Sequence, residues 1–319
     1  MWPHSKPQRG PRGERNFSST ERAARLVKVL GEEEWKTLLG LERASMKYGF
    51  ADPGMASRLA GIPLERVNFA LDRLNGRDLV RGRGANFTLT FSAIEALALR
   101  EYVRRGLISA LGAIIAKGKE SDVYEAFTEE GGLLAVKFFK IGRTSFRDVA
   151  RKRSLERSET KGWIARNYEA AKKELSSLRK LEGLTKSVPR AIAHDRSTVL
   201  LEELNGVKLV ERPELDDPPL ILKEIIECVR VAYKEAGMIN ADLSEYNILT
   251  DGRSVWLIDW PQAVRTTHPN SAALLQRDLH TVLKFFRRVY RVLLEESEVA
   301  DYVVGRRATL GIRRAGPAS

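Results

Sequence analysis

The sequence is poor in cysteine and histidine, with one Cys and four His among 319 residues. A single thiol excludes a disulfide framework and a zinc site built from several cysteines. Cys228 lies in an apolar helical pattern with Ile225, Ile226 and Val229, which favours a packed thiol over a nucleophile. The low cysteine content is typical of reducing cytosol, so we expect a cytoplasmic location.

Long apolar runs are also missing. The longest local candidate, residues 107–115, is shorter than the ~18 residues that a membrane-spanning helix needs. No hydrophobic signal-peptide core lies near the N-terminus. We therefore expect no membrane partner.

Basic charge is in excess, with 54 Lys and Arg against 42 Asp and Glu, a formal net charge of +12. Such an excess predicts a polyanionic partner, most often RNA or DNA. The alternative is a surface rich in charges of both signs. The length predicts about two domains, each with its own core.

The N-terminal part combines a basic arm with a helix-turn-helix pattern. Residues 1–16, rich in Pro, Gly and Arg, are predicted to form a disordered basic arm. Residues 17–90 read as a winged helix-turn-helix domain: a helix capped by Ser19 or Thr20, two helices around the turn at 61–63, and a β-hairpin. Residues 91–108 follow as a linker helix capped by Ser92. The candidate nucleic-acid contacts are Arg66 and Arg73 on the second helix and Arg81 and Arg83 on the hairpin. Such a module can equally be a protein-docking domain.

Residues 111–140 read as three strands joined by two turns. The first turn carries Lys119, Glu120 and Ser121, and its backbone N–H groups and hydroxyl could bind a phosphate. It is not a Walker A loop, because Glu120 stands where Ser or Thr should follow the Lys. By itself the turn is a weak signal, and a common surface hairpin is the alternative.

Lys137 stands in a strand that is otherwise apolar. Because a buried ammonium without a partner is costly, we expect an anionic partner. Glu174, on a helix that starts near Trp163, is the candidate, with Glu169 and Glu182 as rivals. A lysine that protects a strand edge is the alternative interpretation.

Residues 140–166 hold nine Lys and Arg against three acids, a net charge of +6 (9 − 3). Few apolar residues anchor this basic insert, which predicts a flexible segment that orders on RNA or nucleotide. A solvated helix of mixed charge is the alternative.

Three polar side chains in the C-terminal half suit phosphoryl transfer. Asp242 and Asn247 are five positions apart (247 − 242), and Asp259 follows a strand that a turn at 251–254 should join to the strand after Asn247. Kinases use an Asp to take the acceptor proton and an Asn and a second Asp to hold Mg²⁺. The alternative reading is that the three are turn formers and caps. In the connector after the strand at 198–201, the backbone of Glu202 and Leu204 could pair with an adenine edge.

Taken together, these motifs resemble the Rio family of atypical serine/threonine protein kinases, specifically its winged-helix branch, the second Rio kinase subfamily. The residues that carry the resemblance are the segments 118–124, 135–137, 142–146, 240–247 and 258–262. The resemblance implies an α+β fold in which the winged-helix domain precedes a truncated, two-lobed kinase domain: an N-lobe at 109–203, a C-lobe at 204–305 and a basic tail at 306–319.

The same resemblance implies an autophosphorylating enzyme that uses ATP and Mg²⁺ or Mn²⁺ and acts on small ribosomal subunit precursors and their rRNA. By matched position, Lys119, Glu120 and Ser121 lie over the phosphates, Lys137 pairs with Glu174, Asp242 is the catalytic Asp, and Asn247 and Asp259 hold metal. No A-P-E motif follows Asp259, so ordinary recognition of a protein substrate is not implied.

Three other functions stay open. An ATPase switch could place the phosphoryl group on Asp259, since a carboxylate is a competent nucleophile. A non-catalytic, nucleotide-bound RNA-binding scaffold would suit the basic segments. A small-molecule phosphotransferase of the aminoglycoside type shares the Asp and Asn pattern, but a small acceptor needs no basic surface. The sequence does not indicate an oligomeric state.

Overall fold

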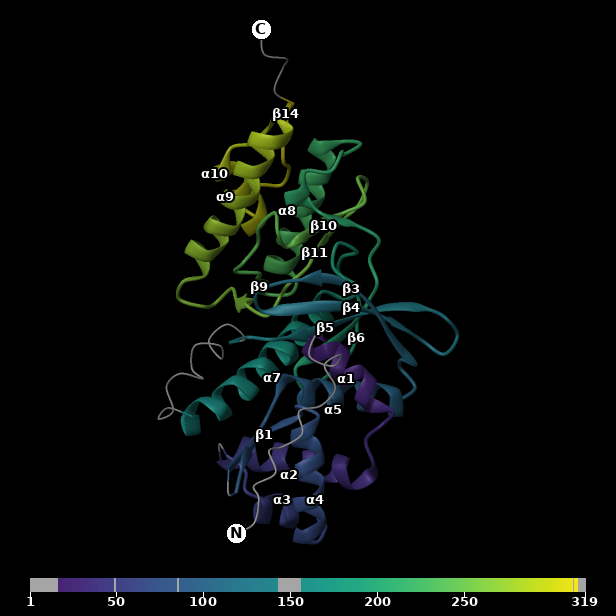
Figure 1. Cartoon of the computed structure of the whole chain (residues 1–319). Helices are drawn as coiled ribbons and strands as arrows, with labels where there is room; N and C mark the ends of the chain where they lie inside the picture. Colours follow the sequence, from purple (N-terminus) through teal and green to yellow (C-terminus); the bar gives the residue numbers. More distant parts are fainter. Residues whose placement is uncertain (1–16, 49, 85, 143–155, 312, 315–319) are drawn as a thin grey trace. The chain divides into compact units, whose positions relative to one another are not determined.

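The computed structural model describes residues 17–48, 50–84, 86–142, 156–311 and 313–314 (Figure 1). The chain divides into two compact units. Unit 1 holds the described residues up to Ala171 together with His194–Thr198, and unit 2 holds Lys172–Ala193 and the described residues from Val199 onward. The predicted arm at 1–16, the part of the basic insert at 143–155 and the end of the predicted tail lie outside the described residues.

Unit 1 begins with helices and a hairpin. In chain order they are α1 (Ser19–Val27), α2 (Glu32–Tyr48), α3 (Pro53–Ala60), α4 (Leu64–Gly76), β1 (Val80–Arg83), β2 (Asn86–Leu89) and α5 (Phe91–Arg104). Gly61 adopts φ 68° at the end of α3, a left-handed conformation that favours glycine. In α2, a Cβ at Gly40 would lie 2.6 Å from the carbonyl oxygen of Ala56, so glycine permits the close approach of α2 and α3.

Two helix starts differ from the prediction. Ser18, not Ser19 or Thr20, is the N-cap of α1, and its Oγ accepts from the N–H of Glu21 at 3.1 Å. Thr90, not Ser92, caps α5. In both cases the residue just before the first helical one has the extended backbone that lets its side chain bond into the first turn.

A β-meander of three strands follows α5 in unit 1. Strands β3 (Ala110–Lys117), β4 (Ser121–Phe127) and β5 (Leu133–Phe139) pair antiparallel in that order. The β4–β5 register runs without a break from Ser121 opposite Phe139 to Phe127 opposite Leu133. The last five residues of β5 are all buried, so apolar residues occupy both of its faces and Lys137 lies among them.

Two elements run through the division between the units: the helix α7 (Glu156–Leu181), which starts earlier than the predicted Trp163, and the hairpin of β6 (Ala191–Asp195) and β7 (Thr198–Glu202).

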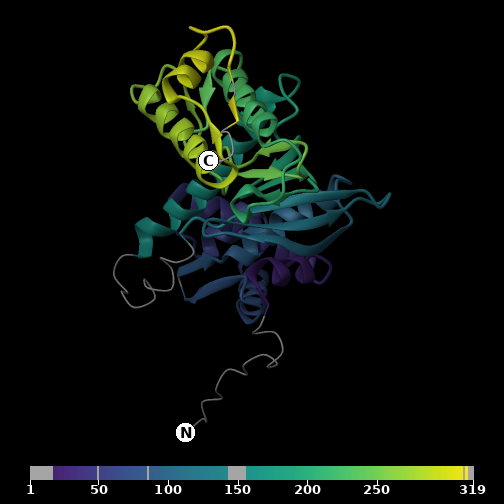
Figure 2. The ribbon, with the colours of Figure 1, turned by 90° about the horizontal axis from the view of Figure 1, so that it is seen from above.

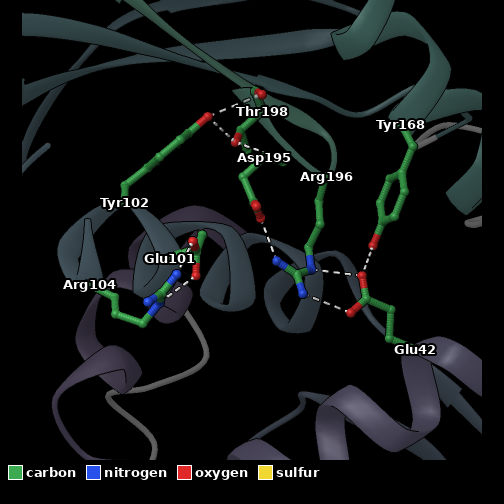
Figure 3. A network of polar contacts seen from close by, with 8 residues as sticks. All are labelled: Glu42, Glu101, Tyr102, Arg104, Tyr168, Asp195, Arg196 and Thr198. Atoms are coloured by element: carbon green, nitrogen blue, oxygen red, sulfur yellow. Dashed lines mark hydrogen bonds and ion pairs between the residues drawn. The ribbon is translucent and has the colours of Figure 1, made fainter. Parts of the chain in front are cut away.

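A buried polar network fastens the turn of this hairpin to the helices of unit 1 (Figure 3). Glu42 of α2 accepts from Nε of Arg196 at 2.7 Å and from its Nη2 at 2.9 Å, and it also accepts from the hydroxyl of Tyr168 on α7. Nearby, the hydroxyl of Tyr102 on α5 donates to the carbonyl of Thr198 at 3.2 Å. Burial and the charge of Glu42 raise the pKa of Tyr168. One carboxylate thus holds α2, α7 and the hairpin turn together.

Beyond β7, the described part of unit 2 contains helices and several short sheets. Its elements after β7 are β8 (Val207–Lys208), η2 (Leu209–Glu211), α8 (Pro218–Lys234), β9 (Met238–Ile239), β10 (Ile248–Thr250), β11 (Val255–Leu257), β12 (Val264–Arg265), α9 (Ser271–Tyr290), β13 (Val292–Leu293), α10 (Glu296–Val304) and β14 (Arg313–Arg314). Strands β11, β10 and β8 form one antiparallel sheet, and β12–β9 and β13–β14 form two others.

Helices α8, α9 and α10 pack against one another, as Figures 1 and 2 show. Cys228 is buried in α8, as predicted, and its Sγ lies 3.7 Å from the carbonyl of Ser187. Part of the predicted tail is paired, because β14 lies along β13. Within the described residues no helix is both long and apolar enough to cross a bilayer.

Candidate active site

The loop after β9 and the β10–β11 hairpin bring two predicted metal ligands together within unit 2. The hairpin forms as the turn signal predicts, with Ile248 opposite Leu257. Just beyond the last paired residues, the N–H of Ile258 donates to the carbonyl of Asn247 at 2.9 Å. Since Asp259 follows Ile258 directly, Asn247 and Asp259 lie at the same end of the hairpin.

Two asparagine side chains connect this end of the hairpin to Asp242. The Asn240 amide accepts from the N–H of Asp242 at 3.1 Å, and its Nδ2 donates to the carbonyl of Asp259 at 3.1 Å. The Nδ2 of Asn247 donates to the carbonyl of Asp242 at 2.9 Å. The main chains of Asp242 and Asp259 are therefore joined through one buried amide. The Asn247 bond uses its nitrogen, so its Oδ1 is left as the acceptor of that side chain.

Backbone strain marks the same loop. Ala241 has φ 64° and Asp259 has φ 71°, in the left-handed region that non-glycine residues seldom adopt. Such conformations persist only where surrounding contacts hold them, and they cluster at active sites. Here the contacts are the bonds of Asn240 and those of Asp278.

Asp278 of α9 binds the main chain of the loop around Asp242. Its carboxylate is buried and accepts from the N–H of Ala241 at 2.7 Å and from the N–H of Leu243 at 3.3 Å. Arg277 beside it donates to the carbonyl of Ala241. Burial raises the pKa of Asp278 to about 6, although the two N–H donors and Arg277 act in the opposite direction. Asp278 and Arg277 thus hold the main chain of Ala241 and Leu243, the two neighbours of the predicted catalytic Asp242.

The electrostatics around Asp242 indicate a place for a cation. Partial burial, and then the nearby charge of Asp259, raise the pKa of Asp242. Two carboxylates that repel each other are stabilised by a positive ion between them. Among the residues that the structure describes, no three His, Cys, Asp or Glu side chains gather to hold a metal by themselves. The hard oxygens of Asn247 and Asp259, next to Asp242, therefore fit an ion such as Mg²⁺, which takes its remaining ligands from phosphates and water.

The predicted nucleotide residues of unit 1 lie on the β-meander. Lys119 and Glu120 are exposed in the turn between β3 and β4, and Ser121, which begins β4, is half-buried. The N–H of Gly118 donates to the carbonyl of Ser121 at 2.8 Å, which closes the turn. Lys137 is buried on β5, opposite Val123, with its ammonium 4.9 Å from the ring centroid of Phe139.

The remaining predicted residues belong to unit 2. Glu174 is buried on α7. Glu202 ends β7, and its N–H donates to the carbonyl of Arg190 at 3.0 Å. In the connector that follows, the carbonyl of Leu204 accepts from the N–H of Gly206 at 3.0 Å.

The predicted nucleic-acid contacts take part in ion pairs within unit 1. Arg66 pairs with Glu33, Arg73 with Glu34 at 3.2 Å, and Arg81 with Asp78 at 3.1 Å. The side chain of Arg83 lies outside the described residues. A phosphate would have to compete with these carboxylates, and contact with RNA stays a prediction.

Comparison with known proteins shows the family to which the chain belongs. A family model described as the RIO domain matches residues 122–299, more than half of the chain. The chain belongs to the RIO family of protein kinases. It is 32% identical over 249 residues to the RIO-type serine/threonine-protein kinase Rio2 of Methanocaldococcus jannaschii, covering 76% of this chain and 91% of the relative. It is 28% identical over 272 residues to the serine/threonine-protein kinase rio2 of Schizosaccharomyces pombe, covering 83% and 78%.

A solved structure shares the fold. The Rio2 kinase–ADP/Mg²⁺–phosphoaspartate complex from Chaetomium thermophilum matches with a TM-score of 0.75 at 25% identity, covering 89% of each chain. The predicted resemblance to the second Rio subfamily is confirmed, and so is the class of enzyme, an ATP-dependent protein kinase. The fold is confirmed as a mixed α/β, kinase-like RIO domain preceded by helices.

Two residues of the loop framework were missed by sequence reasoning. The sequence places Asn240 within the segment 240–247 that carries the resemblance, but gives it no role of its own. Asp278 has no local signal that links it to the loop, because it lies 35 and 37 positions from the residues it holds.

Proposed function

We propose that this protein is a serine/threonine kinase that uses ATP with Mg²⁺ or Mn²⁺, and that Asp242 is its catalytic base. The observation that carries the proposal is the framework around Asp242: Asn240 joins its main chain to that of Asp259, and burial, then the charge of Asp259, raise the pKa of Asp242. A partly buried carboxylate with a raised pKa and a nearby hard-oxygen pair is suited to proton transfer beside a bound ion.

In the proposed reaction, the hydroxyl oxygen of the acceptor forms a bond to the γ-phosphorus while the bond from that phosphorus to the bridging oxygen of ADP breaks. Asp242 takes the hydroxyl proton, and the ADP oxygen keeps the electron pair of the broken bond. A metal ion held by Asn247 and Asp259 would neutralise phosphate charge when it is bound. The strained, doubly supported loop keeps these oxygens in place before the substrate arrives.

Other residues would bind the nucleotide. We assign the phosphates to the turn of Lys119, Glu120 and Ser121 and to Lys137, whose buried ammonium would pair with Glu174. The adenine contacts would use the carbonyl of Glu202 and the N–H of Leu204. The N–H of Glu202 and the carbonyl of Leu204 already take part in local bonds.

The decisive experiment compares Asp242→Asn and Asp259→Asn with the wild-type chain, using labelled ATP. Asp242→Asn should lower phosphoryl transfer by about 10²–10⁴-fold, the usual contribution of a positioned base, and should still bind nucleotide. Asp259→Asn should weaken the binding of Mg²⁺–ADP more than that of metal-free ADP. Unchanged transfer in both variants would favour the non-catalytic scaffold.

A second candidate is an ATPase switch in which Asp259 receives the phosphoryl group. The related Chaetomium complex contains a phosphoaspartate together with ADP and Mg²⁺, and Asp259 here is the carboxylate whose charge acts on Asp242. Its oxygen would attack the γ-phosphorus, ADP would leave, and water would later release phosphate. Label that hydroxylamine removes from the protein would support this switch, and acid-stable phosphoserine would support the kinase.

The cellular role we propose is maturation of the small ribosomal subunit, with rRNA and the subunit precursor as partners. The support comes from the net charge of +12 and from the order α3, α4, β1, β2, which is that of a winged helix-turn-helix. Crosslinking of the full chain to pre-ribosomal particles, followed by mapping of the RNA, tests this role. Crosslinks confined to proteins would contradict direct rRNA contact.

A further inference from the structure

A buried lysine lies next to the nucleotide turn of unit 1, where the sequence predicted the start of the flexible basic insert. Lys140 follows β5 and is 1% exposed. Its ammonium lies 2.8 Å from a carboxylate oxygen of Asp122 and 3.3 Å from one of Glu95. It also donates to the hydroxyls of Ser19 at 2.9 Å and Thr20 at 2.8 Å.

The ammonium stays charged in this position. Burial lowers the pKa of Lys140, but the charges of Glu95 and Asp122 raise it, and the net result lies above the ordinary value. A buried charge persists only where its partners are well placed. Removal of Lys140 would leave the carboxylates of Asp122 and Glu95 without their cation in an almost dry site.

The main chain of the same lysine reaches the nucleotide turn. Its N–H donates to the carbonyl of Glu120 at 2.6 Å, one position beyond the last β4–β5 pair, Ser121 opposite Phe139. Asp122, which holds the ammonium, directly follows Ser121. Lys140 therefore fixes the turn at two points, through its backbone at Glu120 and through its side chain at Asp122.

The other partners come from helices that precede the segment matched by the RIO domain model, residues 122–299. Ser19 and Thr20 form the first turn of α1, and Glu95 lies on α5. The hydroxyl of Ser19 donates to Glu95 at 3.2 Å, and the hydroxyl of Ser18 lies 3.0 Å from that of Tyr124 on β4. The start of α1 is thus bound to the β-meander at the strand that leaves the nucleotide turn.

We propose that Lys140 is a positioning residue for nucleotide binding, which lets the N-terminal helices α1 and α5 set the geometry of the turn at Lys119, Glu120 and Ser121. The inference rests on the proposed binding of phosphates by that turn. The turn would bind the nucleotide equally well in the ground state and in the transition state. Loss of the Lys140 cluster should therefore raise Kd and KM for nucleotide and leave kcat nearly unchanged. By linkage, bound nucleotide also holds α1 more firmly in place.

The test uses two variants of the full chain and one control. Ser19→Ala/Thr20→Val removes two hydrogen bonds of the ammonium and keeps both ion pairs, so it should fold. Lys140→Met removes the charge and could unfold unit 1, which far-UV circular dichroism would reveal. The control, Tyr102→Phe, removes a buried hydroxyl from the same helix as Glu95, where it bonds Thr198 and not the turn (Figure 3).

Calorimetry with Mg²⁺–ADP and steady-state kinetics with ATP give the readout. We expect the double variant to weaken ADP binding and raise KM about fivefold to thirtyfold, within the usual range of coupling between sites. The control should change both by less than twofold, even if it lowers Tm equally. Equal affinities in wild type, double variant and folded Lys140→Met would overturn the inference. A wild-type chain that binds no Mg²⁺–ADP would instead overturn the proposed function.

Discussion

At the scale of single residues, the loop around Asp242 depends on the ionisation of Asp278. The charged carboxylate accepts from two loop N–H groups, yet it is 2% exposed, and burial raises its pKa to about 6. Its ordinary pKa is 3.8. A group with a raised folded-state pKa contributes stability that is present below its unfolded pKa and is lost as the pH rises through its folded pKa. For Asp278 that window runs from about pH 4 to about pH 6.

We therefore expect the pH dependence of stability to change in Asp278→Asn, which cannot ionise. The free energy of unfolding of the wild type, relative to the variant, should fall by about 3 kcal/mol between about pH 4 and pH 7, since each unit of pKa shift corresponds to about 1.4 kcal/mol. Urea unfolding of both proteins across this range measures the difference. A constant difference would contradict the assignment. At pH 7 the variant should also lose more kcat than nucleotide affinity, because the amide can accept from only one side.

At the scale of secondary-structure elements, the carboxylate of Glu42 connects α2, α7 and the β6–β7 turn (Figure 3). Glu42→Gln removes the two-pronged partner of the half-buried Arg196 guanidinium and leaves it the ion pair with Asp195. We expect the free energy of unfolding to drop by about 2 kcal/mol, because a charged group loses its hydrogen-bond partner. Arg104→Gln is the matched control, because the Glu101–Arg104 pair in the same view is exposed on the arginine side, and its loss should change the free energy of unfolding far less. Urea unfolding that gave equal losses would exclude a special role for Glu42.

The sequence predicts a contact well when the residues that form it are close together along the chain. The β10–β11 hairpin and the meeting of Asn247 with Asp259 were predictable, because a turn signal and two short strands lie within a dozen residues. The N-caps of α1 and α5 were missed by one or two positions, since several neighbouring hydroxyls could have capped them. The contact of Glu42 with Arg196 was not predictable, because 154 positions separate the two and no local pattern pairs them.

At the scale of the whole molecule, only part of the basic charge is free to bind a polyanion, because some arginines already pair with carboxylates. Three of the four arginines expected to meet phosphates already face carboxylates; the pairs are Arg66 with Glu33, Arg73 with Glu34, and Arg81 with Asp78. Residues 141–166 carry a net charge of +5 (8 − 3), since Lys140, the first residue of the predicted insert, is buried in ion pairs. Each phosphate contact by an already paired arginine must first give up an ion pair, so the basic insert should dominate binding.

The salt dependence of RNA binding separates these two sources of charge. The logarithm of the association constant falls with the logarithm of salt concentration by about 0.7–0.9 for each phosphate contacted. Arg151→Gln/Arg153→Gln in the insert should therefore reduce this slope by about 1.5, and Arg66→Gln/Arg81→Gln, with the same number of charges removed, by about 0.5 or less. Fluorescence anisotropy with a labelled small-subunit rRNA fragment, titrated over a series of salt concentrations, measures both. A larger change in the Arg66 and Arg81 variant would show that these arginines exchange Glu33 and Asp78 for phosphates on binding.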